Sequence, residues 1–231
     1  MTESQIEQYA LDILANLGWQ ILHGPDIGPD GAVAERELRQ VVLPGRLQSA
    51  LVRLNPHIPE PALNEAMRRL TQISKPSLVE NNHEFHQLLV AGVPVQYRMS
   101  SGEVKHDIVR VVDFTSPKNN DFVAVNQLTV LQGDYNRRPD IVLFVNGLPL
   151  VVIELKNAAD TKADLVAAYQ QIQTYKREIS DLFRFNELCM TSDGLEAEMG
   201  TITSPLERMM PWKTIDGEKE VGNVPMLEVL L

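Results

Sequence analysis

Two short apolar runs, joined by Asn146-Gly147, constrain the fold of this chain more than any other feature. Residues 141–145 read Ile-Val-Leu-Phe-Val, and residues 148–153 read Leu-Pro-Leu-Val-Val-Ile. An Asn-Gly pair between two β-prone runs is among the strongest short-range signals for a β-hairpin. Because every position in both runs is apolar, other elements must cover both faces of these strands. We therefore predict an α/β fold, in which a mixed central sheet is flanked by helices.

The segments before these strands read mainly as helices and loops. Residues 4–17 carry apolar side chains at helical spacing, and Ser4 with Glu7 matches the capping-box pattern that begins many helices. The Gly- and Pro-rich stretch 24–31 is predicted to be a loop. No Gly-Lys-Ser/Thr sequence follows it, so it is not a phosphate loop. Residues 34–92 are predicted to form a mostly helical insert.

The pattern changes from helical to strand-like at about residue 93, where we place the start of a core region that extends to about residue 200. The whole of 1–231 is treated as one domain. The expected helices of the insert are 36–42, 47–54, one opening at Pro61, and 77–90. The core is expected to contain a hairpin of 93–99 with 107–114, a strand within 121–131, a helix over 164–176 and a last strand over 185–190. The apolar end, 225–231, indicates either a truncated chain or a docked terminal element.

Charge and cysteine content exclude several classes of protein. The net charge is −10, yet residues 137–177 carry six basic and four acidic side chains, so this segment is +2 and the rest −12. Because phosphate neutralisation needs Lys and Arg, we expect this chain alone to bind DNA weakly. Cys189 is the single cysteine, which excludes an internal disulfide and a cysteine-rich zinc site. No apolar stretch is long enough to span a membrane, and the composition fits a cytoplasmic protein.

The end of the second apolar run carries charge at a place where burial is expected. Glu154-Leu155-Lys156 follows this run, and side chains two apart in a strand share a face. Asp140 precedes the partner strand, so a hairpin brings it beside Glu154. A two-residue turn would pair Asp140 with Ile153 and put the two carboxylates on opposite faces. A three-residue turn or a β-bulge pairs Asp140 with Glu154 on one face, and we predict one of these.

Asp140 and Glu154 are suited to hold a cation, because two neighbouring carboxylates repel each other unless a cation lies between them. Oxygen ligands with open water positions suit Mg²⁺, and such a cation polarises a phosphodiester and activates water. A neighbouring lysine stabilises the phosphate charge or positions the attacking water. The acid-x-Lys pattern also begins at Glu103 and Asp160, but only Glu154 ends an apolar strand opposite a Pro-Asp pair. The alternative interpretation is a solvated hairpin end with a surface ion pair.

Residues 136–157 closely resemble the nuclease region of the restriction (R) subunit of type I restriction-modification enzymes. That region is a RecB-like member of the PD-(D/E)xK nuclease superfamily, so the resemblance implies a restriction-endonuclease-like fold. The resemblance extends through most of the chain. Other segments that resemble the family are Leu54-Asn-Pro-His57, Glu80-Asn-Asn-His83, Asn119-Asn-Asp-Phe122, Val125-Asn-Gln127, Ser192-Asp-Gly194 and Pro211-Trp212.

The resemblance implies roles for the residues around the two strands. It implies that Asp140 and Glu154 bind Mg²⁺, for which Mn²⁺ substitutes. The backbone carbonyl of Leu155 is implied as a further metal ligand. Lys156 is implied to be catalytic, in agreement with the reading of the acid-x-Lys pattern above.

The resemblance also extends to two helices. Gln171 and Tyr175 match the family's Gln-x-x-x-Tyr motif, and they share a helix face because they are four residues apart. The alternative is a core tyrosine beside a solvated glutamine. Glu7 resembles the first-helix glutamate that related nucleases place near the metal, and the alternative is its capping-box role.

The function implied by the resemblance is Mg²⁺-dependent hydrolysis of DNA phosphodiester bonds. In that family an ATP-driven motor follows this region and translocates DNA, and the present sequence contains nothing like it. The expected partners are double-stranded DNA and the methylation and specificity subunits of a restriction-modification complex, with no membrane partner. The alternatives are a RecB-like or resolvase-like nuclease outside restriction, and a nuclease-like docking domain that does not cut.

Overall fold

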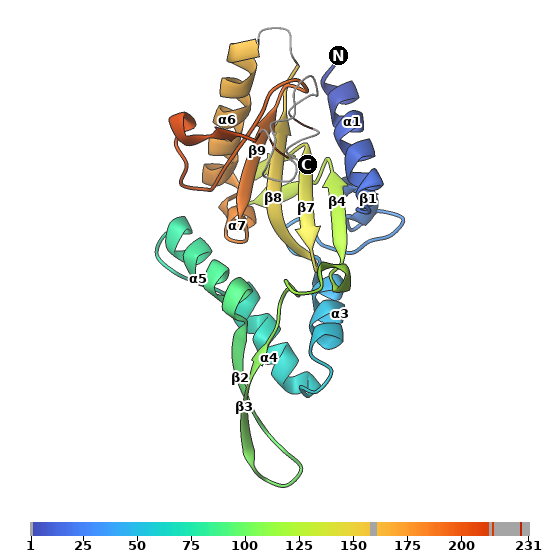
Figure 1. The fold of residues 1–231 in the computed structure, drawn as a ribbon, viewed down its shortest axis with the longest axis vertical. Coiled ribbons are helices and arrows are strands. Elements are labelled where there is room, and N and C mark those ends of the chain that lie inside the picture. Colours follow the sequence, from blue (N-terminus) through green and yellow to red (C-terminus); the bar gives the residue numbers. More distant parts are fainter. Residues whose placement is uncertain (1, 158–160, 213, 215–226, 228–231) are drawn as a thin grey trace.

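The computed structural model describes residues 2–157, 161–212, 214 and 227, and its centre is a seven-stranded mixed sheet (Figure 1). The pairs β1–β4 and β8–β9 are parallel, and the other neighbouring pairs are antiparallel. This confirms the predicted α/β class with a mixed central sheet. In spatial order the strands are β1 (Gln20–His23), β4 (Phe122–Asn126), β7 (Ile141–Val145), β8 (Leu148–Leu155), β9 (Leu188–Ser192), β10 (Ala197–Gly200) and β11 (Met210–Pro211).

Helices cover both faces of the sheet, as the two continuous apolar strands require. Helix α1 (Glu3–Asn16) lies on one face, and α6 (Thr161–Glu178) lies on the other (Figure 1). Alternate residues of the central strands point to opposite faces. Accordingly Ile153 packs in the cluster that includes Ile6 and Leu14 of α1, whereas Val152 packs in the cluster that includes Ile172 of α6.

The β7–β8 hairpin combines a two-residue turn with a β-bulge. Val145 pairs with Leu148 across the turn, but the register shifts between Leu143 and Phe144, which leaves Leu150 as the extra residue of β8. Beyond the bulge Ile141 pairs with Ile153, a register that places Asp140 opposite Glu154. Of the two predicted alternatives, the structure confirms the β-bulge, and the three-residue turn is wrong.

The turn itself has the backbone that Asn-Gly favours. Asn146 has φ 52° and Gly147 has φ 80°, so both residues lie in the left-handed region, as in a type I′ turn. The Asn146 side chain is buried and donates to the carbonyl of Val111. Its Oδ1 accepts from the N–H of Asp121 at 2.8 Å. The turn is thus built into the molecule rather than exposed at its edge.

The helical insert packs at the end of the sheet where this turn lies (Figure 1). Its helices are α3 (Pro44–Leu54), α4 (Glu60–Thr71) and α5 (Leu78–Ala91). The hairpin predicted from 93–99 and 107–114 is present as β2 (Val93–Arg98) and β3 (Val104–Val109), so its second strand begins and ends earlier than predicted. It forms a separate two-stranded sheet beside α4. The remaining short elements are α2 (Gly24–Ile27), η1 (Pro117–Asn119), β5 (Val130–Gln132), β6 (Tyr135–Arg137), α7 (Ser180–Phe183) and η2 (Leu206–Arg208).

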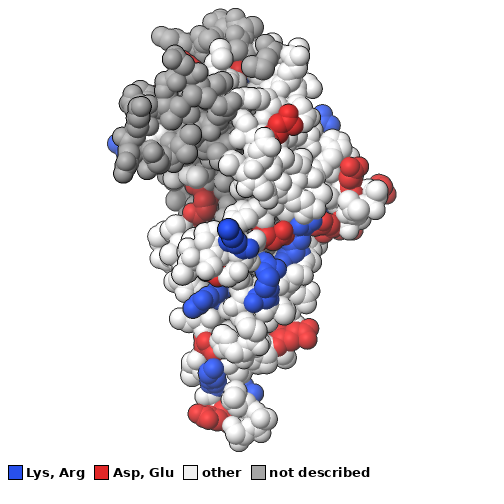
Figure 2. Space-filling view, turned by 45° about the vertical axis from the view of Figure 1, so that its right-hand side comes forward, with Lys and Arg blue, Asp and Glu red and all other residues white. Residues whose placement is uncertain are grey.

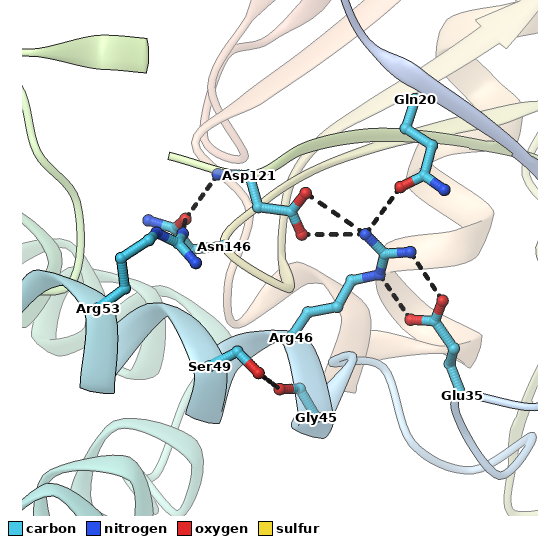
Figure 3. A network of polar contacts seen from close by, with 8 residues as sticks. All are labelled: Gln20, Glu35, Gly45, Arg46, Ser49, Arg53, Asp121 and Asn146. Carbon is cyan, nitrogen blue, oxygen red and sulfur yellow. Dashed lines mark hydrogen bonds and ion pairs between the residues drawn. The ribbon is translucent and has the colours of Figure 1, made fainter. Parts of the chain in front are cut away.

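Arg46 of α3 ties the insert to the sheet (Figure 3). Its guanidinium pairs with Glu35 at 2.6 Å and with Asp121 at 3.0 Å, and it donates to the side-chain oxygen of Gln20 at 2.9 Å. Asp121 immediately precedes β4, and Gln20 begins the parallel strand β1. All these contacts lie at the end of the sheet where the parallel strands β1 and β4 begin, on the same side as the β7–β8 turn.

Several local predictions are wrong, for identifiable reasons. Thr2, not Ser4, caps α1, because the capping box forms with Gln5 two positions earlier than predicted. Residues 36–42 do not form a helix. There the buried Arg36 donates to the backbone carbonyls of Leu38, Gln40 and Thr129, and these bonds hold an irregular segment.

Two further differences concern the N-terminal region and the end of the chain. Within the predicted loop 24–31, residues Gly24–Ile27 form a single helical turn, and the edge strand β1 was not predicted. The prediction for 225–231 lies outside the described residues, apart from Leu227, which is buried. No helix in the described ranges has the length and apolar content needed to cross a membrane.

Candidate active site

The residues predicted from the hairpin meet at one end of the sheet, opposite the β7–β8 turn. Asp140 precedes β7, Glu154 and Leu155 end β8, and Lys156 follows directly. Asp140 Oδ2 accepts from the backbone N–H of Leu155 at 2.8 Å. The Lys156 ammonium donates to Glu154 Oε1 at 2.9 Å, to the Leu155 carbonyl at 3.1 Å and to Glu3 Oε1 at 3.0 Å.

Glu154 is buried, with 2% of its surface exposed, and one of its oxygens is unpartnered. Oε1 accepts from Lys156, whereas Oε2 has no hydrogen-bond partner among the described residues. Burial, followed by the negative charge of Asp140, raises the pKa of Glu154 to about 7. Burial also raises the pKa of Asp140 to about 6, although the Leu155 N–H and the Lys156 charge oppose this shift. The pair is therefore short of positive charge despite the lysine beside it.

Lys156 stays charged in this environment. Burial alone would lower the pKa of its ammonium, but the charge of Glu154 and hydrogen bonds to Glu154 and Glu3 raise it above its usual range. A permanently cationic group therefore lies within hydrogen-bonding distance of the carboxylate pair. All three donors of the ammonium are used here, so it faces an anionic ligand by exchanging one of these contacts, which its flexible stem allows.

The helix α6 brings Tyr175 to the same cluster. The Tyr175 hydroxyl donates to the carbonyl of Arg138 at 3.4 Å and lies close enough to Glu154 to favour its charged form. Burial and the charge of Glu154 raise the pKa of the phenol, while Gln171, one helical turn earlier, opposes this shift. Tyr175 is mostly buried and Gln171 half-buried. Tyr175 therefore lies beside Glu154, and Gln171 lies next to Tyr175 on the same helix.

Glu7 reaches the site from α1 and is not a capping-box residue. Its Oε1 accepts from the Asn126 amide at 2.7 Å, and its Oε2 accepts from the Gln127 amide at 2.6 Å. The negative charge of Glu7 contributes to the raised pKa of Asp140, so the two carboxylates lie near each other.

Sequence reasoning did not assign roles to Glu3, Asn126 and Gln127, which all contact predicted site residues. Glu3 precedes Glu7 by four residues and therefore shares its helix face, which was an available signal. Val125-Asn-Gln127 was noted only as a segment that resembles the family. Contacts this distant along the chain leave no spacing pattern in a single sequence.

The donor set fits a hard cation. Two carboxylates and the Leu155 carbonyl are oxygen ligands, which Mg²⁺ prefers, and Mg²⁺ commonly uses one or two carboxylates and keeps several waters. The unpartnered Oε2 of Glu154 is an available ligand atom. In the described part of the chain, no group of three or more His, Cys, Asp or Glu side chains is arranged to hold a metal. The candidate centre is therefore a two-carboxylate site rather than a closed protein cage.

Comparisons with known proteins identify the family. Residues 1–208 match the family described as type I restriction enzyme R protein N terminus. The chain belongs to this family. It is 42% identical over 218 residues to the type I restriction enzyme HindI endonuclease subunit of Haemophilus influenzae, an alignment that covers 94% of this chain and 21% of that protein.

A second relative of the R-protein N-terminal family is more distant. The type I restriction enzyme SauMSSORF170P endonuclease subunit of Staphylococcus aureus is 31% identical over 133 residues, which cover 57% of this chain and 13% of that protein. The chain thus spans about a fifth of the length of the Haemophilus relative and matches less of the other. The family membership confirms the resemblance that the sequence showed.

Proposed function

We propose that this chain is the DNA-cleaving region of a type I restriction enzyme R subunit. In this proposal it hydrolyses phosphodiester bonds with Mg²⁺ held by Asp140, Glu154 and the Leu155 carbonyl. The observation that carries the proposal is the carboxylate pair, in which Glu154 is buried and Asp140 is half-buried. Beside Asp140, Glu154 has an oxygen without a hydrogen-bond partner among the described residues and a pKa raised to about 7. Such a pair contributes little to the stability of a protein, and carboxylates with perturbed pKa values of this kind mark functional sites.

Each residue of the cluster has a defined task in this proposal. A bound divalent cation supplies Lewis acidity toward the phosphodiester and toward an attacking water. Lys156, which stays charged, stabilises the phosphate or orients the water. Tyr175 supports the Glu154 carboxylate from the α6 face and Gln171 orients Tyr175, as residues around metal ligands commonly do. Glu7 adds negative charge beside Asp140.

The finer parts of the proposal concern the whole enzyme. Double-stranded DNA is the substrate, and the methylation and specificity subunits are the partners. ATP acts only in a motor region outside the present sequence, which delivers DNA to this site. The expected location is the cytoplasm. The family membership and the names of the relatives, which are endonuclease subunits of type I restriction enzymes, support this assignment.

The test is Mn²⁺ binding, measured by electron paramagnetic resonance, to the wild type and to Asp140→Ala and Glu154→Ala at matched folding. We expect one site in the wild type that both substitutions abolish. Glu65→Ala is the control, because Glu65 is an exposed carboxylate of α4 that pairs with Arg68. Equal binding by all four proteins would place the metal elsewhere. In the assembled enzyme, cleavage that survives Lys156→Ala would favour a docking domain that does not cut.

A further inference from the structure

Two side-chain amides at the end of β4 hold both oxygens of Glu7. Asn126 Nδ2 donates to Glu7 Oε1 at 2.7 Å, and Gln127 Nε2 donates to Oε2 at 2.6 Å. The Asn126 amide is oriented from its other side, because its Oδ1 lies 3.1 Å from Nδ1 of His23. We call Asn126 and Gln127 together the amide clamp. Each carboxylate oxygen of Glu7 thus has a neutral donor.

Gln127 adopts an uncommon backbone conformation to make this contact. Its φ is +54°, and the left-handed region is unfavourable for a non-glycine residue. Such residues cluster at functional sites, where the surrounding structure holds them in place. Gln127 and Asn146 are the non-glycine residues with positive φ among those described, and Asn146 is explained by its turn.

Neighbouring backbone fixes Gln127 from two sides. Its N–H donates to the carbonyl of Asp140 at 2.9 Å, which extends the β4–β7 pairing to the residue that carries the site carboxylate. On the other side Gly24 approaches so closely that a Cβ there would lie 2.3 Å from the Gln127 carbonyl oxygen. One residue therefore contacts Asp140 through its backbone and Glu7 through its side chain.

We propose that Gln127, assisted by Asn126, is a positioning residue that holds the Glu7 carboxylate beside Asp140 so that the cluster binds a divalent cation. This inference rests on the metal site of the proposed function. A neutral clamp suits that task, because it orients the carboxylate without cancelling its charge, as a lysine or arginine would. The geometry supports their proximity, because Gln127 donates its side-chain amide to Glu7 and its backbone N–H to the carbonyl of Asp140.

The test compares Mn²⁺ affinity in the wild type, Gln127→Gly, Glu7→Ala and the double variant. Glycine at residue 127 accepts the left-handed backbone and removes the side chain with its amide, so thermal unfolding should stay near that of the wild type. We expect Mn²⁺ binding about tenfold weaker in Gln127→Gly. In the Glu7→Ala background the same substitution should have no further effect, because Gln127 acts through Glu7. Asn126→Ala provides the same test without changing the left-handed residue.

Gln132→Ala is the matched control, because its half-buried amide bonds Ser180 and the N–H of Asp181, outside the cluster. It should bind Mn²⁺ like the wild type. Unchanged affinity in both Gln127→Gly and Asn126→Ala overturns the inference and leaves the metal site standing. A loss of equal size in the Glu7→Ala background also overturns it. Absence of Mn²⁺ binding by the wild type instead rejects the proposed metal site, and the inference with it.

Discussion

The carboxylate pair of Asp140 and Glu154 makes the stability of this protein depend on pH. Burial raises both pKa values, to about 6 and about 7, above those of the same groups in an unfolded chain. At pH values between the unfolded-state pKa and the raised folded-state pKa of each group, the folded state binds more protons than the unfolded state. The stabilisation from these groups is therefore complete below about pH 4 and is lost as the pH rises through 6 and 7.

We expect that without divalent cations the free energy of unfolding falls between pH 5 and pH 8, by on the order of 2 kcal/mol from Glu154. Glu154→Gln removes this titration, so its stability should change less over the same range. Urea denaturation of both proteins at several pH values measures the difference. Parallel curves for the two proteins would contradict the raised pKa of Glu154. Added Mg²⁺ should stabilise the wild type more at pH 8 than at pH 5.5, because binding requires ionised carboxylates.

At the scale of elements, the β7–β8 turn requires glycine at residue 147 for a second reason besides its φ of 80°. A Cβ at Gly147 would lie 2.6 Å from the carbonyl oxygen of Leu43 and 2.8 Å from the backbone nitrogen of Leu47. The Gly147 carbonyl also accepts from the Leu43 N–H. The start of α3 thus packs directly against the backbone of the turn.

Gly147→Ala should therefore cost more than Gly133→Ala, its matched control. Gly133 also has positive φ, at 58°, but a Cβ there meets nothing within 4 Å. We expect a loss of about 1 kcal/mol for Gly133→Ala, from left-handed strain alone. For Gly147→Ala we expect roughly 3 kcal/mol, from strain plus displaced backbone. Equal denaturation midpoints for the two variants would show that α3 moves aside freely.

The elements that could be predicted from the sequence are those with strong local signals. The central hairpin follows from continuous apolar runs and Asn-Gly, and α6 follows from its apolar spacing. The edge strand β1 has four residues of mixed exposure, so it shows no run or alternation. The segment around Arg36 was misread because long-range bonds to carbonyls such as that of Thr129 override helix propensity.

Some features of the candidate site could likewise be predicted from local sequence signals, and others could not. Asp140, Glu154 and Lys156 were predictable because one hairpin brings them together. The bulge at Leu150 was predictable only as a requirement of their register, since no residue there marks a bulge. The contacts of Glu7 with the amide clamp join residues 119 and 120 positions apart, and these depend on how α1 docks on the sheet.

At the scale of the whole molecule, opposite charges alternate where the insert meets the sheet. On the face seen in Figure 2, lysine and arginine side chains gather across the middle of the molecule, with acidic side chains among them. In this junction Arg46 pairs with Glu35 and Asp121 (Figure 3). These contacts lie at the end of the sheet opposite the candidate site.

Arg46→Ala should lower stability while leaving metal binding intact. The substitution leaves Glu35 and Asp121 without their cation, and all three side chains are partly buried, so we expect a loss of about 1–3 kcal/mol. The denaturation midpoint and the Mn²⁺ affinity, measured on the same samples, separate the two effects. Weakened Mn²⁺ binding under conditions where the variant is fully folded would show that the two ends of the sheet are coupled.

The site is complete only when α1 packs on the central sheet, whose strands are synthesised much later than α1. Glu3 and Glu7 leave the ribosome well before their partners, because Gln127 follows Glu7 by 120 positions and Lys156 follows Glu3 by 153. At a translation rate of about 5–20 residues per second, that interval lasts on the order of ten seconds. During this time the apolar face of α1 has no sheet to cover. The nascent chain thus carries its two first-helix carboxylates without a site for them until the central strands have been made.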